Sequence, residues 1–475
     1  MKKELAAIAI ATLIPSHIMA GGLLTNSNQS ASFLRNPARD AIIDIDGVYT
    51  NPAGVCFMPQ GFHFGFTLQH PEQQRNVTTT FPGIAGNINH YGEATHKFKG
   101  QASAPIVPSF QAAKVMDRWT VSASFAFSGG GGKCEFDNGI GSIESVFSML
   151  PAIAQKMELP VKAYSINSFM KGKQYYLGIQ LGAGYRINDN IAVFAGIRSV
   201  IGTASYKGYV NDIKLYTDVA TQTELPQAYT QQLIQGIGQQ LGVPASDIGN
   251  GDINMNTSQS CIGWTPVVGI DWRINEHWNI AAKYEFRTKM NLKNSTEMNA
   301  FARKLPMLNK FNDDANEKVR DDIPGTATIG VQYSPVKAIR ISGGFHFYDD
   351  CNATRYNNEQ KLIDSGTREL LAGVEWDMND KITVSAGWQN THYSLSDEFM
   401  QDMSYNCSSN LIGFGARYNV NEKVSIDLGY MHNFYQDRTV SIPNYSIGSI
   451  KTGMEKTDLY QRTNSVVAIG LNLSL

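Results

Sequence analysis

The stretch KQYYLGIQLGAGYRI, residues 173–187, decides the fold because two kinds of side chain alternate along it. From Tyr175 to Ile187 the odd positions are all apolar, whereas most even positions are polar or glycine. A period of two predicts a β-strand with one apolar face. Six further stretches repeat the pattern, at residues 278–286, 338–347, 381–388, 411–418, 424–430 and 467–475.

The connections between these stretches predict how many strands there are. Six short polar turns join apolar strand ends, within residues 114–121, 185–193, 272–280, 333–341, 376–384 and 418–426. Longer insertions lie between them, at residues 129–172, 207–260, 291–323, 349–366 and 436–461. Short turns on one rim and long loops on the other are typical of outer-membrane barrels, with the short turns periplasmic. Six turns with both termini on the same rim predict seven hairpins, hence an all-β, closed antiparallel barrel of 14 strands.

Composition and targeting signals narrow the class of protein. The 475 residues carry a formal charge of −2, so no nucleic-acid partner is expected. Residues 1–20 read as a signal peptide, with a basic start and an apolar run at 5–14. No later run approaches the roughly 20 apolar residues of a membrane-spanning helix. The chain is therefore either an inserted barrel or a secreted all-β sandwich or propeller, and the apolar stripe opposite small residues favours the barrel.

The segment before the first strand has the size of a plug. A 14-strand barrel has a lumen too wide for wall side chains alone to fill. Residues 21–60 precede the barrel at 61–475 and contain two Asn-Pro-Ala turns, at 36–38 and 51–53. Proline fixes its own backbone and restricts the residue before it, so both turns would be rigid. We expect residues 21–60 to fold into the lumen as a hatch.

An NPAG motif that leads from such a segment into the first alternating strand resembles the FadL/TodX family of outer-membrane transporters. The resemblance implies passive, non-enzymatic uptake of hydrophobic compounds, long-chain fatty acids or aromatic hydrocarbons, in a Gram-negative outer membrane. It implies a lumen closed by the hatch and a sideways release of the substrate into the bilayer through a kinked early strand. Its hatch motif corresponds here to Asn51, Pro52, Ala53 and Gly54.

Two features of the early strands are candidates for that kink. Proline removes a backbone donor and a glycine run packs no side chains, so either can interrupt a strand ladder. The candidate residues for a lateral opening are Pro105, Pro108, Gly129 and Gly130.

The long loops predict helical segments that would meet a hydrophobic ligand. Apolar residues recur near helical spacing in the loops, and we predict Leu233, Ile237, Phe301 and Leu305 as ligand contacts. Packing of the loops against one another as a lid is an equal alternative. A fatty-acid carboxylate would need a cation, for which Lys283 and Arg287 are candidates, although pairing with a neighbouring carboxylate is the simpler role for each.

Other chemistries find little support in the sequence. The run SGGGGKC lacks P-loop spacing, and His392 with Ser394 lacks a third partner for a phospholipase. The five cysteines and nine histidines show no metal-binding spacing. We therefore expect no catalytic residue, metal or cofactor, and a monomer whose partners are hydrophobic small molecules and outer-membrane lipids. A diffusion porin for polar solutes and a surface adhesin remain rival functions for the same barrel.

Overall fold

The computed structural model describes residues 30–475, apart from 241–242, 314–318 and 448–449. The predicted signal peptide and residues 21–29 of the predicted hatch lie outside the described residues.

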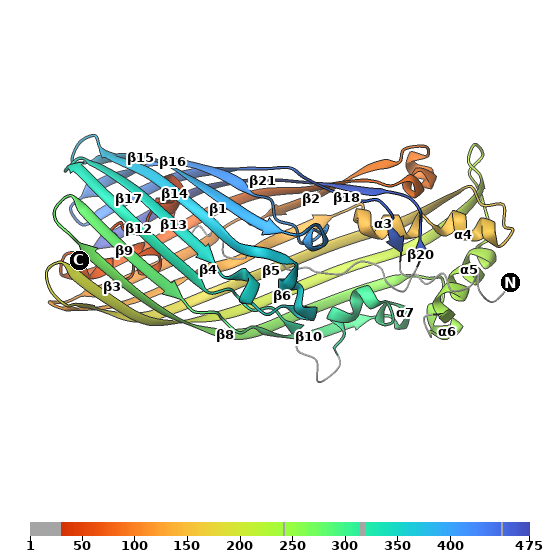
Figure 1. The fold of residues 1–475 in the computed structure, drawn as a ribbon, viewed down its shortest axis with the longest axis horizontal. Helices are drawn as coiled ribbons and strands as arrows, with labels where there is room; N and C mark the ends of the chain where they lie inside the picture. Colours follow the sequence, from red (N-terminus) through yellow and green to blue (C-terminus); the bar gives the residue numbers. More distant parts are fainter. Residues whose placement is uncertain (1–29, 241–242, 314–318, 448–449) are drawn as a thin grey trace.

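Fourteen antiparallel strands form a closed barrel, which confirms the predicted strand count (Figure 1). The barrel closes where β1 pairs with β21, from His63 opposite Ser474 to Thr80 opposite Thr457. Each of the six predicted short turns joins two neighbouring strands at one rim, near the C-terminus. The strands in ring order are β1 (Gly61–Thr80), β3 (Val107–Val115), β4 (Trp119–Phe136), β5 (Ala163–Arg186), β6 (Ile191–Asp218), β8 (Ile253–Arg273), β9 (Trp278–Glu285), β12 (Thr326–Val336), β13 (Ile339–Tyr348), β14 (Ile363–Asp377), β15 (Ile382–Leu395), β16 (Ser409–Asn421), β17 (Val424–Tyr435) and β21 (Lys456–Ser474).

Shorter strands extend this wall or decorate its loops. β2 (Thr95–Ser103) continues the line of β3 after a break, and β10 (Asn291–Met298) does the same for β9. Strands β5 and β6 run for 24 and 28 residues, so much of the predicted loops 129–172 and 207–260 is strand. The remaining strands are β7 (Thr223–Glu224), β11 (Val319–Arg320), β18 (Arg438–Ile442), β19 (Ser446–Ile447) and β20 (Ile450–Lys451).

Helices occupy the lumen and the loop end. In the described residues, no helix is both long and apolar enough to cross a membrane. The α-helices are α1 (Ala31–Arg35), α2 (Gly47–Thr50), α3 (Gly141–Phe147), α4 (Leu150–Lys156), α5 (Gln227–Gln240), α6 (Ala245–Ile248) and α7 (Ala300–Arg303). The 3-10 helices are η1 (Gly54–Phe57), η2 (Pro82–Gly86), η3 (Ile88–His90), η4 (Pro306–Phe311), η5 (Asp350–Asn352), η6 (Tyr356–Leu362) and η7 (Asp397–Phe399).

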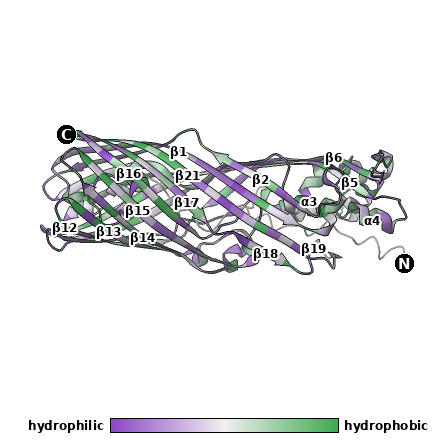
Figure 2. Ribbon diagram, turned by 90° about the horizontal axis from the view of Figure 1, so that it is seen from above, coloured by the Kyte–Doolittle hydropathy of each residue, from purple (hydrophilic) through white to green (hydrophobic). Residues whose placement is uncertain are grey.

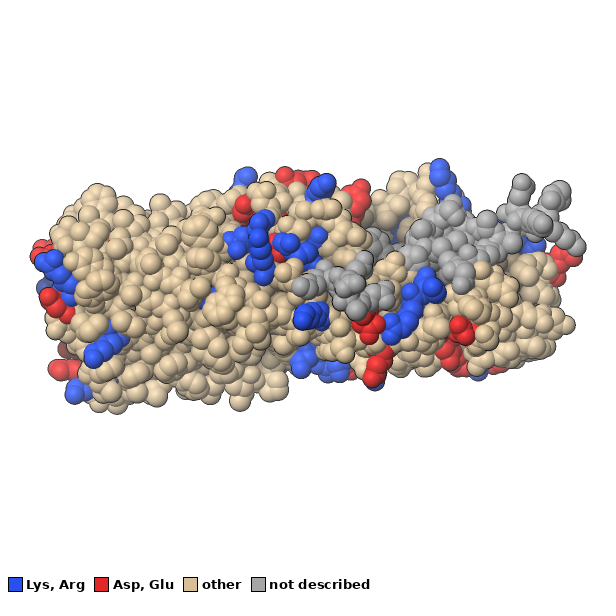
Figure 3. Space-filling view, turned by 90° about the horizontal axis from the view of Figure 1, so that it is seen from below, with Lys and Arg blue, Asp and Glu red and all other residues tan. Residues whose placement is uncertain are grey.

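The two faces of the wall differ as the alternation predicts. On β5, Leu181 is 57% exposed on the outer face whereas its neighbour Gln180 is buried inside. Apolar residues follow the strands in alternation (Figure 2). On the face drawn in Figure 3, charged side chains lie at the short-turn rim and over the loop half, and the band between them carries few. An uncharged band of this kind is what the hydrocarbon core of a bilayer requires.

Candidate functional site

The described part of the predicted hatch, residues 30–60, is mostly buried and contacts the wall strands β8, β14, β16, β17 and β21. Its first helix, α1, is capped by Ser30, whose hydroxyl oxygen accepts a hydrogen bond from the Phe33 amide at 3.0 Å. The helix packs against β16, β17 and β21 through Ala31 and Leu34. One wall residue beside α1 is a glycine, Gly413. A methyl group at this position would collide with the carbonyl oxygen of Leu34, so α1 can approach the wall this closely only because the side chain is absent.

Buried ion pairs join the hatch to the wall. Arg35 donates to Glu375 on β14 at 2.8 Å, and Arg39 contacts the same carboxylate at 3.1 Å. Arg39 also pairs with Asp46 within the hatch at 2.5 Å. We call the whole set the hatch network: Arg35, Arg39, Asp44 and Asp46 of the hatch, with Arg340, Glu375, Asp377, Arg417 and Asp427 of the wall.

The hatch network explains how charged residues are tolerated in the lumen. The side chains of Arg35 and Arg39 are each 1% exposed, and such groups are costly to bury without partners. On the wall, Arg417 bridges Asp44 of the hatch at 2.7 Å and Asp427 at 2.8 Å. Both signs alternate through the network, so each buried charge contacts an opposite one.

The NPAG motif forms a second attachment to the wall. The Asn51 amide donates to Asp271 on β8 at 2.5 Å, and its carbonyl oxygen accepts from the Gly54 amide at 3.1 Å. Ala53 is fully buried between Phe194 and Val267. The motif therefore closes its own turn while it binds the wall.

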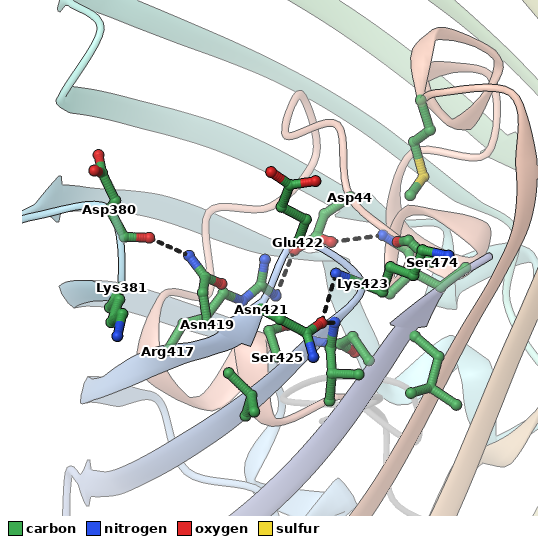
Figure 4. Close-up of a pocket in the computed structure, with 16 residues that line it drawn as sticks. Asp44, Asp380, Lys381, Arg417, Asn419, Asn421, Glu422, Lys423, Ser425 and Ser474 are labelled. Atoms are coloured by element: carbon green, nitrogen blue, oxygen red, sulfur yellow. Dashed lines mark hydrogen bonds and ion pairs between the residues drawn. The ribbon is translucent and has the colours of Figure 1, made fainter.

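Below the hatch, a polar vestibule opens toward the short-turn rim. It has a volume of about 570 Å³. Hatch and wall meet there at Asp44 and Arg417 (Figure 4). Its rim is formed by charged residues of two turns: Asp380, Lys381, Glu422 and Lys423.

Above the hatch, a small cavity of about 40 Å³ lies between Phe33, Tyr49 and the wall. Lys283 lines this cavity, but its ammonium donates to Glu285 at 2.7 Å and to the Tyr49 carbonyl at 2.8 Å. Glu285 also binds Arg198 at 2.6 Å. Lys283 is therefore paired, and the cavity has room for little more than water.

The predicted lateral-opening residues border a gap in the wall. Pairing of β3 with β4 ends at Phe110 opposite Phe125. It resumes between β2 and β4 only at Gln101 opposite Glu135. Within the part of the chain that the structure describes, no backbone pairs join residues 102–109 to residues 126–134, and we call this interval the strand gap.

Proline and glycine account for the strand gap. Pro105 lies in the break between β2 and β3, and Pro108 lies in β3 without an amide donor. On the other edge, the register of β4 against β5 shifts on both sides of Gly129. Gly130 has a φ of +112°, which side chains rarely permit, so only glycine suits this bulge.

The predicted ligand contacts divide into two groups. Leu233, Ile237, Phe301 and Leu305 are buried together in one apolar cluster at the loop end. We call this cluster, with helices α3 to α7, the lid. The two predicted cations are not part of it.

Arg287 lies outside the lid, in the interruption between β9 and β10. Its side chain is 41% exposed and donates to the Asn352 carbonyl at 2.6 Å. His392, considered for a phospholipase, is exposed on β15, where its strand neighbour Tyr393 is buried.

Sequence reasoning missed the hatch arginines. A signal was present, because residues 35–46 contain two arginines and three aspartates in a chain with only 17% charged residues. Charges that flank a rigid Asn-Pro-Ala turn inside a predicted plug should have suggested partners on the inner wall.

A closed barrel with a charge-anchored plug and an interrupted wall defines an outer-membrane transport protein. The chain belongs to the outer membrane protein transport protein family (OMPP1/FadL/TodX), whose model matches residues 170–474. The short-turn rim is then periplasmic and the lid extracellular.

Solved structures agree on the fold. A FadL homologue from Pseudomonas aeruginosa superposes with a TM-score of 0.66 at 13% identity, covering 96% of this chain and 100% of that one. The toluene transporter TbuX of Ralstonia pickettii gives 0.56 at 12% identity, covering 97% and 99%. The toluene transporter TodX of Pseudomonas putida gives 0.55 at 14% identity, covering 94% and 99%. No curated protein sequence matches the chain.

Proposed function

We propose that this protein carries hydrophobic small molecules passively into the outer membrane and releases them sideways through the strand gap. The observation that carries this proposal is the interval without backbone pairs between residues 102–109 and 126–134. Unpaired strand edges facing lipid are costly, so a gap in a membrane barrel requires a functional reason.

The outer mouth of the strand gap suits an apolar molecule. Ile106 is 62% exposed beside the gap, and Phe110 and Phe125 are exposed at its lower end. A substrate that leaves here moves between apolar side chains and lipid without crossing water. Each methylene kept from water is worth about 0.8 kcal/mol, so a long alkyl chain strongly favours this exit.

The axial route is unsuited to the same molecule. It is crossed by the buried ion pairs of the hatch network, such as those of Arg35 and Arg39 with Glu375. Beyond the hatch lies the charged vestibule. An apolar substrate would gain nothing there to offset the charges that it displaces.

We propose that the substrate is first captured at the lid. Leu233, Ile237, Phe301 and Leu305 lie in the apolar cluster there, and this cluster would separate to admit an apolar chain. Under this proposal a fatty-acid carboxylate meets Arg287 beside the lid in competition with Asp322, whose carboxylate lies 3.8 Å away. Lys283 stays bound to Glu285. Long-chain fatty acids and aromatic hydrocarbons both fit these contacts, and two of the similar structures are toluene transporters.

Uptake by proteoliposomes tests the proposal. We expect vesicles with this protein to take up labelled oleate or toluene faster than empty vesicles, and the preferred compound identifies the substrate class. A double substitution, Pro105→Thr with Pro108→Thr, restores two backbone donors and should slow uptake by narrowing the gap.

Pro266→Thr is the matched control, because this proline lies in β8, away from the gap, and pairs with Ile197. Equal uptake by both variants would count against lateral release. A large, steady conductance of the wild-type protein in planar bilayers would instead favour the porin.

A further inference from the structure

Three side chains with metal-binding atoms meet at helix α3 of the lid. His90 ends η3, His96 lies on β2 and Glu144 lies on α3. Their ligand atoms all lie within 4.8 Å of one another. The Glu144 carboxylate contacts His90 Nε2 at 3.2 Å and His96 Nδ1 at 3.1 Å, through different oxygens.

The three side chains are close enough to share one metal ion. Zinc binds imidazole nitrogen and carboxylate oxygen at about 2.0–2.2 Å, so two ligands at tetrahedral positions are about 3.3–3.5 Å apart. The two contacts of Glu144 are a few tenths of an ångström shorter and use different oxygens, so an entering ion would replace both hydrogen bonds. It would be bound by ligand atoms that already lie within 4.8 Å of one another.

Other residues hold the carboxylate in place. The Asn87 amide donates to Glu144 at 2.7 Å, and the Tyr164 hydroxyl donates to it at 3.3 Å. Outer hydrogen bonds of this kind orient the ligands of metal sites.

The surroundings leave access for an ion and a water molecule. The side chains of His90 and His96 are 16% and 29% exposed, whereas Glu144 is 5% exposed. Three protein ligands with one open position are typical of zinc sites that keep a bound water. Calcium and magnesium prefer all-oxygen ligands and fit this set poorly.

We propose that His90, His96 and Glu144 bind a zinc ion on the extracellular lid. The site departs from the sequence expectation of no metal, because its ligands come from three separate segments. An ion there would tie η3 and β2 to α3, whose Val146 and Phe147 belong to the apolar cluster of the lid. The proposal is independent of the transported substrate.

Metal titration of the full chain tests the site. The protein is purified in detergent with an affinity tag that contains no histidine, and metal is removed with EDTA. Calorimetric titration with zinc chloride should show one saturable equivalent, and cobalt(II) should give the intense visible absorption of a four-coordinate complex. His90→Ala and His96→Ala should each weaken zinc binding at least about tenfold.

His70→Ala is the matched control, because His70 is exposed on β1 and contacts only one carboxylate side chain, Glu72. It should bind zinc as the wild type does. Each histidine variant leaves Asn87 bonded to Glu144, and unchanged heat-modifiable migration verifies the barrel. Absence of a saturable zinc equivalent, or equal affinity in His96→Ala, overturns the proposal.

Discussion

Substitution of Arg39 tests whether the hatch network keeps the lumen closed. Arg39 contacts Asp44 at 3.0 Å, Asp46 at 2.5 Å and Glu375 at 3.1 Å, with its side chain 1% exposed. Arg39→Met keeps most of the side-chain volume and removes the charge. We expect the seated hatch to lose stability relative to a displaced one.

The expected magnitude follows from which carboxylates lose their partner. Glu375 keeps Arg35, and Asp44 keeps Arg417, whereas Asp46 loses its arginine and retains a hydroxyl donor from Ser30. Loss of one partner of a buried pair costs about 3–5 kcal/mol. The shared contacts favour the lower end, and about 3 kcal/mol raises the ratio of displaced to seated hatch about 10²-fold.

Conductance in planar bilayers measures this ratio as the frequency of open events. Arg39→Met should open about 10²-fold more often than the wild type. The double variant Arg39→Met with Asp46→Asn should recover most of the closure, because it also removes the orphaned carboxylate. As a control, Arg303→Met breaks the half-exposed pair with Asp313 in the lid and should leave the lumen closed. An unchanged opening frequency in Arg39→Met would refute the reasoning.

Three further predictions concern the hatch and one loop. Asn51→Ala removes a hydrogen bond to the wall and should destabilise the seated hatch by about 1–3 kcal/mol, seen as more frequent opening. Gly413→Ala should displace α1 by collision with Leu34 and make the hatch accessible to added protease; Gly343→Ala, whose nearest contact would be 3.7 Å away, should not. Burial raises the pKa of Glu359 in η6 from 4.5 to about 7, so the folded loop holds this proton more tightly than the unfolded chain. Protonated Glu359 therefore stabilises the folded loop fully below about pH 4.5, and this stabilisation is lost as the pH rises through about 7. Hydrogen-exchange protection of residues 356–362 should fall from pH 5 to pH 8 in the wild type, and Glu359→Gln should reduce that fall.

The barrel was predictable because lipid imposes a strict pattern on the sequence. Every residue that faces hydrocarbon must be apolar, so the alternation in residues 173–187 is visible without homologues. The polar turns are equally clear, since a two- to four-residue reversal has to be polar at the membrane surface. Beyond the membrane this constraint ends, so the sequence predicts loops where the outer parts of β5 and β6 continue as strands.

The contacts of the site were less predictable than its location. Proline and glycine change the backbone wherever they occur, whatever their neighbours. Pro105 and Gly130 could therefore be proposed from the sequence as residues that interrupt a strand. Arg39 and Glu375 are partners across 336 residues, and no local pattern indicates that pairing. The same holds for His90 and Glu144, which meet only because α3 folds back onto β2.

The hatch network also has a consequence for the order of assembly. The plug is the first part of the described chain, but its partners Glu375, Arg417 and Asp427 lie on β14, β16 and β17, near the end. The plug can be locked only after these late strands have joined the wall. A barrel that lacks these strands would leave the hatch arginines without their carboxylate partners on the wall. The hatch would then be bound less stably in an incomplete barrel than in a complete one. The ion pairs thereby couple stable seating of the hatch to insertion of the last strands.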